Sequence, residues 1–297
     1  MKILNGAFCA TVTPMTKDGE RILPENIGPL FHYFSTSGLD GILLLGSTGE
    51  GASLSLEEKK VLIDEASSCR GGLKLILGCI TTSMSELMEL VQLGKKKNAT
   101  ALLIPPPFYY KSVTEEGIEK YFEYVLERSE VPILLYNIPS NTGISLSRGM
   151  LERLSRFDTL YGIKESSGKI QETSKYLLTK PKRILLGSDM NLLRGLELGV
   201  EGIISACANV VPELVVNIRK GYLSGKEVTI LQKRLSEVRK ALGQIPFLAG
   251  LKRWMKFRDI EVGGIRLPYY SLTKEEQDKI LLIASKYNIN SELHTSF

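Results

Sequence analysis

The sequence predicts an α/β fold, a (β/α)8 TIM barrel with a C-terminal helical extension. Three observations support this prediction. Short apolar segments alternate with amphipathic helical segments, which is typical of a parallel sheet whose crossovers are helices. The apolar segments are continuous, as expected of strands that are buried on both faces. The chain has 297 residues, enough for a barrel of roughly 250 residues with an extension.

Eight segments have the length and composition of buried strands. They lie at residues 6–12, 41–45, 73–77, 101–104, 132–136, 160–163, 184–186 and 202–204. Their even alternation with helical patterns favours a closed barrel over a doubly wound sheet. No GxGxxG motif follows the first segment, which argues against a dinucleotide-binding fold.

Helical segments between the strands carry recognisable start signals. Thr114 occupies the N-cap position of segment 115–127, in which Ile118, Phe122 and Val125 recur at helical spacing. The tail has longer helical patterns, at residues 228–242, 248–258 and 274–287.

We therefore expect two regions: the barrel with its site in residues 1–226, and two or three helices in residues 227–297 that pack on the barrel. No low-complexity linker separates the two regions, so we expect one folding unit.

Composition and charge argue against several classes of function. The net charge is +5, and the basic clusters at residues 95–97 and 180–183 are short, so no nucleic-acid partner is predicted. No apolar run reaches the length of a membrane span, and the apolar start of the chain ends too soon for a secretory signal. The expectation is a soluble, cytoplasmic protein without a membrane partner.

Cysteine and histidine spacing predicts neither disulfides nor a metal site. The four cysteines are far apart and form no CxxC pair, which is typical of reduced thiols in a chain of this length. The two histidines, His32 and His294, are not at metal-ligand spacing. His32 lies in a helical pattern, where packing is its expected role.

The predicted chemistry is centred on Lys164, which follows the apolar run 160–163. A charge at the end of a buried strand is costly to desolvate, and burial favours the neutral form of an amine. A neutral amine attacks a ketone to form a Schiff base, which then acts as an electron sink. The alternative interpretation is a lysine that leaves an edge strand and points into water.

Other chemistry-bearing residues follow the other predicted strands. In a parallel barrel these carboxyl ends meet on one face, where active sites lie. The glycines and hydroxyls of residues 46–51 allow several backbone N–H groups to point at one carboxylate-sized anion, although a plain tight turn is the alternative. The remaining strand ends run into residues 105–110, 136–139, 187–189 and 205–209.

These residue types suit a lysine imine. The substrate carboxylate must be held, and a proton must move to and from the carbinolamine and the leaving alkoxide. Tyr136 belongs to the strand next to that of Lys164, so its hydroxyl is expected near the amine. A packed ring with a hydrated hydroxyl is the alternative for each tyrosine. The imine on Lys164 makes a metal or other cofactor unnecessary, and none is expected.

The order and spacing of these motifs resemble the family of dihydrodipicolinate synthase and N-acetylneuraminate lyase, which are pyruvate-dependent class I aldolases. The resemblance covers nearly the whole chain and is carried by Thr11-Val12-Thr13-Pro14, Gly46-Ser47-Thr48-Gly49-Glu50, Tyr136-Asn137-Ile138-Pro139, Gly162-Ile163-Lys164 and Gly187-Ser188-Asp189. It implies that Lys164 is the Schiff-base lysine and that Tyr136 transfers the proton.

The resemblance also implies further site residues and an assembly. Ser47 and Thr48 would bind the pyruvyl carboxylate, Tyr110 would complete a proton relay across a subunit interface, and the Ile204 carbonyl would line the pyruvyl pocket. Other expected substrate-binding residues are Gly49, Asn141, Ser166, Gly187 and Asp189. Members of the family are commonly homotetramers built as dimers of dimers.

One departure from the family pattern bears on the substrate. Dihydrodipicolinate synthases usually carry an arginine two residues after the proline of the tyrosine motif, and here that position is Asn141. Asparagine cannot form the bidentate charged contact of arginine. We therefore expect cleavage of a 2-keto-3-deoxy sugar acid, N-acetylneuraminate-like compounds included, to pyruvate and an aldehyde. The alternatives are a 4-hydroxy-tetrahydrodipicolinate synthase, which condenses pyruvate with aspartate semialdehyde, and a non-catalytic barrel that binds a keto acid.

Overall fold

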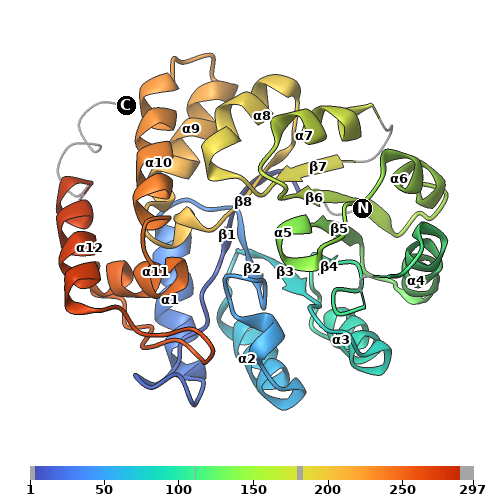
Figure 1. Cartoon of the computed structure of the whole chain (residues 1–297), viewed down its shortest axis with the longest axis horizontal. Coiled ribbons are helices and arrows are strands. Elements are labelled where there is room, and N and C mark those ends of the chain that lie inside the picture. The colour runs from blue at the N-terminus through green and yellow to red at the C-terminus, as the bar shows by residue number, and fades with distance from the viewer. Residues whose placement is uncertain (1–3, 111, 179–182, 288–297) are drawn as a thin grey trace.

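The computed structural model describes residues 4–110, 112–178 and 183–287. In this part of the chain, parallel strands form a closed barrel with helices around it (Figure 1). The strands hydrogen-bond in chain order from β1 to β8, and β8 pairs with β1. The predicted (β/α)8 fold is confirmed.

The strands are short and almost entirely buried, which explains their continuous apolar sequences. They are β1 Gly6–Ala10, β2 Gly41–Leu44, β3 Lys74–Gly78, β4 Ala101–Ile104, β5 Ile133–Asn137, β6 Leu160–Glu165, β7 Arg183–Leu186 and β8 Gly202–Ser205. Each predicted segment overlaps one of them. β6 continues two residues beyond the predicted segment, so Lys164 lies within the strand.

Helices connect the strands, and hydroxyl side chains start several of them. Ser55 forms a capping box with Glu58, and Thr114 accepts a hydrogen bond from the Gly117 amide at 3.2 Å. The helices are α1 Ile27–Thr36, α2 Leu56–Cys69, α3 Met84–Lys96, α4 Glu115–Arg128, α5 Pro139–Thr142, α6 Arg148–Leu154, α7 Ile170–Leu177, α8 Leu192–Leu198 and α9 Pro212–Leu223, with short 3-10 turns at η1 Pro24–Asn26, η2 Gly51–Ser53, η3 Asp189–Asn191 and η4 Cys207–Asn209.

Two hydrophobic clusters fill the described part of the molecule. One lies inside the barrel and includes Phe8, Leu134, Tyr136, Tyr161 and Leu185. The other lies between the strands and the surrounding helices and includes most of the remaining buried apolar residues. Because side chains fill its interior, the barrel is a solid support, and a site has to form at the ends of its strands.

The extension consists of α10 Thr229–Leu242, α11 Phe247–Lys256 and α12 Lys274–Lys286. Figure 1 shows these helices along one side of the barrel, in orange and red. α10 packs against α9 and η3, and α11 packs against α12. The three helices correspond to the three helical patterns of the tail, while the division between residues 226 and 227 stays a prediction.

Several remaining expectations concern single residues. His32 lies in α1 but is exposed, so the expected packing role is wrong. His294 and residues 180–182 of the second basic cluster lie outside the described residues. The cysteines are all free thiols, and those at positions 9, 79 and 207 are buried. None of the helices in the described part of the chain is both long and apolar enough to span a membrane.

Candidate active site

Lys164 lies near the carboxyl end of β6, and its residue surface is only 4% exposed. Its Nζ donates a hydrogen bond to the Tyr136 hydroxyl at 3.2 Å and lies 4.4 Å from the centre of the same ring. A lysine this deeply buried is costly to desolvate, so its position indicates a role other than solubility.

Strand register explains why these two side chains meet. Tyr136 on β5 pairs with Lys164 on β6 in the parallel ladder, so both point to the same side of the sheet. Tyr136 is 3% exposed and packs within the cluster inside the barrel. The ring is therefore fixed by packing, and its hydroxyl is held beside the amine.

The next pair in the ladder ties the same strand ends together. The Asn137 side chain donates to Glu165 Oε2 at 2.6 Å, and the Ser167 amide donates to Glu165 Oε1 at 2.6 Å. Burial raises the pKa of the Glu165 carboxyl, while both hydrogen bonds lower it. These contacts position the ends of β5 and β6 and so support the Lys164 and Tyr136 pair.

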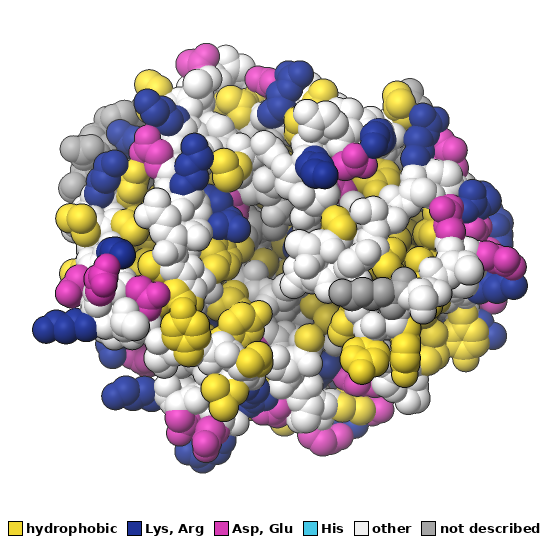
Figure 2. Space-filling view, in the orientation of Figure 1, with side chains coloured by type: hydrophobic (Ala, Val, Ile, Leu, Met, Phe, Trp, Pro, Cys, Tyr) yellow, Lys and Arg dark blue, Asp and Glu magenta, His cyan; other side chains and the backbone are white. Residues whose placement is uncertain are grey.

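A cavity of about 700 Å³ opens over this pair, and Figure 2 shows the surface hollowed near the centre of the barrel. Its volume suits a small organic ligand. The expected site residues that line it are Ser47, Thr48, Tyr136, Asn141, Lys164, Ser166, Gly187 and Ile204. The extension closes one side of the cavity with residues of α10, α11 and the connection between them, and with Tyr269 and Tyr270.

The turn after β2 presents two free backbone donors. The amides of Gly49 and Gly51 both donate to the Gly46 carbonyl, at 3.0 and 3.1 Å. The amides of Ser47 and Thr48 donate to no group in the described part of the chain. Ser47 and Thr48 also line the cavity. If this turn binds a carboxylate, as predicted, its donors are the amides and hydroxyls of these two residues.

Gly49 does not line the cavity. Its carbonyl accepts a hydrogen bond from the Thr13 hydroxyl at 2.6 Å, and a Cβ at this position would lie 2.9 Å from the Thr11 carbonyl oxygen. The structure therefore gives Gly49 a packing function: it lets the turn lie close to the end of β1.

Asp189 and Tyr110 also lie away from the cavity. Asp189 is buried and accepts hydrogen bonds from the Ser205 hydroxyl and, at 3.4 Å, from the Cys207 amide. Burial raises the pKa of this carboxyl, and the two hydrogen bonds oppose that shift. Tyr110 is 69% exposed, with its ring edge-on to that of Tyr109. Its expected role needs a partner subunit and stays a prediction.

A buried ion pair, which the sequence analysis missed, joins the turn after β2 to the extension. Lys252 Nζ lies 2.8 Å from Glu50 Oε1, with both side chains almost fully buried. The Arg266 amide donates to the second Glu50 oxygen at 2.9 Å, and Lys252 also donates to the Gly264 carbonyl at 2.5 Å. Burial lowers the pKa of the Lys252 ammonium, and the Glu50 carboxylate opposes this shift.

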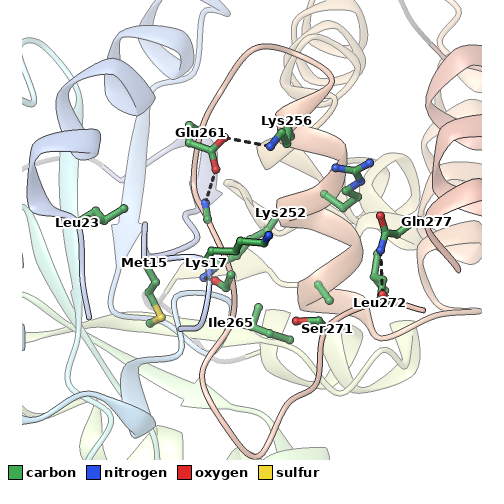
Figure 3. Close-up of a pocket in the computed structure, with 14 residues that line it drawn as sticks. Met15, Lys17, Leu23, Lys252, Lys256, Glu261, Ile265, Ser271, Leu272 and Gln277 are labelled. Carbon is green, nitrogen blue, oxygen red and sulfur yellow. Dashed lines mark hydrogen bonds and ion pairs between the residues drawn. The ribbon is translucent and has the colours of Figure 1, made fainter. Parts of the chain in front are cut away.

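Lys252 also lines a second cavity, of about 300 Å³, between the segment around Met15 and helix α11 (Figure 3). The ion pair between Lys252 and Glu50 therefore attaches the turn that carries Ser47 and Thr48 to helix α11 of the extension. Lys252 does not line the cavity above Lys164. We therefore infer that Lys252 positions the turn and does not contact a substrate.

We expect Lys252→Met to lower the free energy of unfolding by about 3–5 kcal/mol, because it leaves the Glu50 carboxylate buried without its cation. Denaturation in urea measures this change. The matched control is Lys256→Met, whose exposed pair with Glu261 at 3.6 Å should contribute at most about 1 kcal/mol. Equal losses in the two variants would contradict a structural role for the buried pair.

No group of three or more His, Cys, Asp and Glu side chains that could hold a metal ion occurs within residues 4–110, 112–178 and 183–287.

The chain matches a known protein family along most of its length. The family model of the dihydrodipicolinate synthetase family matches residues 3–286. A 4-hydroxy-tetrahydrodipicolinate synthase of Methanothrix thermoacetophila is 31% identical over 292 residues, which cover 96% of this chain and 97% of that protein.

Solved structures are similar to this chain over almost its whole length. The crystal structure of dihydrodipicolinate synthase from Aquifex aeolicus has a TM-score of 0.90 at 26% identity and covers 96% of this chain and 98% of its own. The crystal structure of KD(P)GA from T. tenax has a TM-score of 0.88 at 26% identity, covering 96% and 99%. Because the family model spans almost the whole chain, this protein belongs to the dihydrodipicolinate synthetase family of pyruvate-dependent aldolases and lyases.

Proposed function

We propose that the protein cleaves a 2-keto-3-deoxy sugar acid to pyruvate and an aldehyde through a Schiff base on Lys164. One observation carries this proposal: the buried Lys164 amine lies 3.2 Å from the Tyr136 hydroxyl at the base of a cavity of about 700 Å³. An amine beside a proton carrier is what imine formation and retro-aldol cleavage both require.

The proposed reaction begins with attack of the Lys164 amine on C2 of the keto acid. The carbinolamine loses water to give the imine, and Tyr136 supplies and removes the protons. Tyr136 then takes the proton of the C4 hydroxyl, and the C3–C4 bond breaks. The electron pair of this bond moves toward the imine and forms an enamine. The aldehyde leaves, C3 is protonated, and hydrolysis of the imine releases pyruvate and restores Lys164.

Binding of the C1 carboxylate is assigned to the turn after β2. The amides of Ser47 and Thr48 are available as donors, and hydrogen bonds to a carboxylate are stronger than those between neutral groups. Ile204, at the end of β8, lines the same cavity. This arrangement would place C2 of the bound keto acid toward the amine of Lys164.

Neutral polar groups in the cavity support a substrate that carries several hydroxyls. Asn141 lines the cavity, and the Ser166 hydroxyl is buried there without a hydrogen-bond partner in the described residues. A buried hydroxyl without a partner is costly, so a ligand hydroxyl would stabilise it. Gly187 leaves room for this group, because a Cβ there would lie 1.8 Å from Ser166 Oγ.

A second candidate function is a 4-hydroxy-tetrahydrodipicolinate synthase. The Methanothrix thermoacetophila relative has that name. One observation favours this candidate: Arg239 lines the same cavity as Asn141. Its positive charge would then replace that of the arginine that synthases usually have at position 141. A barrel that only binds a keto acid is the third candidate, and it predicts no covalent adduct when pyruvate and borohydride are added.

Steady-state kinetics with 2-keto-3-deoxygluconate, N-acetylneuraminate and aspartate semialdehyde plus pyruvate test the substrate assignment. We expect a higher kcat/KM for cleavage of a sugar acid than for condensation of the semialdehyde. An absent charge-assisted pair costs about 1.5–3 kcal/mol, which is roughly a tenfold to hundredfold loss. Asn141→Arg should therefore shift the ratio toward the semialdehyde, and Asn141→Gln, the neutral control, should not. A wild-type preference for the semialdehyde would replace this assignment with the synthase.

A further inference from the structure

The second cavity, distinct from the one above Lys164, is lined mainly by cationic and apolar side chains (Figure 3). Its volume is about 300 Å³, and none of the described residues lines both cavities. The charged side chains on its wall are Lys17, Lys252, Arg253, Lys256 and Glu261. Four positive charges against one negative charge favour an anionic ligand.

Two of these cations are already paired with carboxylates of the protein. The Lys252 ammonium is held by a buried carboxylate, as described above, and Lys256 lies 3.6 Å from Glu261. The side chains of Lys17 and Arg253 form no ion pair or hydrogen bond with any described residue. Their charges are therefore the ones that the described part of the protein leaves unmatched.

Arg253 packs on an aromatic ring but lacks a hydrogen-bond acceptor. Its guanidinium carbon lies 5.0 Å from the centre of the Phe257 ring, a distance at which ring and cation attract each other. Its Nε is buried and has no hydrogen-bond partner among the described residues. A buried donor without an acceptor destabilises a protein, and a ligand that supplies the acceptor removes this cost. The planar donors of an arginine fit a carboxylate or a phosphate.

The rest of the wall is largely apolar. It includes the side chains of Met15, Leu23, Ala249, Ile265 and Leu272. Burial of an apolar part of a ligand against such side chains stabilises a complex in proportion to the area removed from water. The volume is at the lower end of the range of ligand sites. These features select a small ligand that combines an anionic group with a short apolar portion.

We propose that this cavity is a binding site for a small organic anion, a carboxylate or a phosphate with a short apolar portion, and that Arg253 binds the anionic group. Lys17 adds a second unpaired positive charge, and the apolar side chains contact the rest of the ligand. The binding site does not depend on the reaction proposed above, because no residue of the cavity above Lys164 takes part in it.

One segment of the chain contributes to both cavities. The connection between α11 and α12 lines the second cavity with residues 263–265 and 271–272, and it lines the active-site cavity with Tyr269 and Tyr270. A ligand in the second cavity would therefore contact both ends of the segment whose middle part forms a wall of the active site. We expect such a ligand to be an effector of the reaction at Lys164.

Isothermal titration calorimetry with phenyl phosphate, benzoate and inorganic phosphate, at constant ionic strength, tests the binding site. We expect saturable binding of phenyl phosphate or benzoate, and weaker binding of inorganic phosphate, which has no apolar portion. The comparison of phenyl phosphate with benzoate identifies the preferred anionic group. Failure of all three compounds to bind at millimolar concentrations would overturn the proposal.

Arg253→Gln should weaken binding roughly tenfold to hundredfold, because it removes charge-assisted hydrogen bonds. Arg253→Lys keeps the charge without the planar donors and should bind with intermediate affinity. The matched control is Arg239→Gln, which removes an arginine that lies 4.3 Å from the Phe247 ring but lines the active-site cavity. This control should bind as the wild-type protein does, and thermal unfolding establishes that each variant is folded. If Arg239→Gln abolished binding and Arg253→Gln did not, the ligand would occupy the active-site cavity and the proposal would be wrong.

The effector role has a separate test, which rests on the proposed function. The pyruvate concentration for half-maximal trapping by borohydride is compared with and without saturating phenyl phosphate. We expect a change of at least about fivefold in the wild-type protein and none in Arg253→Gln. If phenyl phosphate binds but trapping does not change, the effector role is overturned and the binding site stands. If the wild-type protein traps no pyruvate, the proposed function and the effector role both fail, and calorimetry alone decides the binding site.

Discussion

Lys164→Ala is expected to abolish trapping of pyruvate by borohydride while the protein stays folded. In the proposed mechanism the amine is the nucleophile that attacks the keto group, so its removal leaves no group to form the imine. The fold should be retained, because the change removes a buried amine and its desolvation cost and leaves a small cavity. Mass spectrometry of the reduced protein measures the adduct, and circular dichroism measures the fold.

The matched control for this experiment is Lys169→Ala. Lys169 is exposed and follows β6 by a few residues, so its removal changes the same charge near the same loop. Trapping should continue in this variant at the wild-type level. If the Lys164→Ala variant still formed an adduct on another lysine, the whole mechanism would be contradicted, because the covalent intermediate would then form outside the cavity described above.

Tyr136→Phe is expected to lower turnover by roughly 10²–10⁴-fold, the usual contribution of a general acid–base group. The substitution keeps the ring packed inside the barrel and removes only the hydroxyl that lies 3.2 Å from Lys164 Nζ. Protons would then have to reach the carbinolamine and the alkoxide through water. Steady-state kcat for sugar acid cleavage is the measurement.

Tyr161→Phe provides a control within the same barrel. Its hydroxyl accepts hydrogen bonds from the Leu4 amide at 2.7 Å and from Arg183 at 3.0 Å, away from the cavity. Turnover should change little in this variant, although stability can fall. If Tyr136→Phe turned over as fast as the wild-type protein, proton transfer would belong to another group, with Tyr110 from a partner subunit as the first candidate.

The pattern of apolar segments was sufficient to predict the barrel and the face of it on which the candidate active-site cavity lies. Strands buried on both faces leave continuous apolar runs, and chain-order closure brings all their carboxyl ends to one face. Lys164 and Tyr136 could be placed together for the same reason: each lies near the carboxyl end of one of two consecutive strands, and parallel register aligns them.

Residues in the connections were harder to place. Gly49 and Asp189 follow β2 and β7 within a few residues, like Thr48 and Gly187, yet they pack against the ends of β1 and β8 instead of lining the cavity. The direction of a side chain in a turn depends on the path of the backbone and on neighbouring elements, and strand periodicity carries no such information.

The sequence by itself determined the barrel and the position of Lys164 beside Tyr136, because these follow from local apolar runs and from the regular order of strands. Only the tertiary structure decided what the extension adds. Glu50 and Lys252 are 202 residues apart, and Arg239 reaches the cavity from α10. Contacts between such distant segments depend on how helices dock on a completed barrel, and no short-range pattern of residue types encodes that docking.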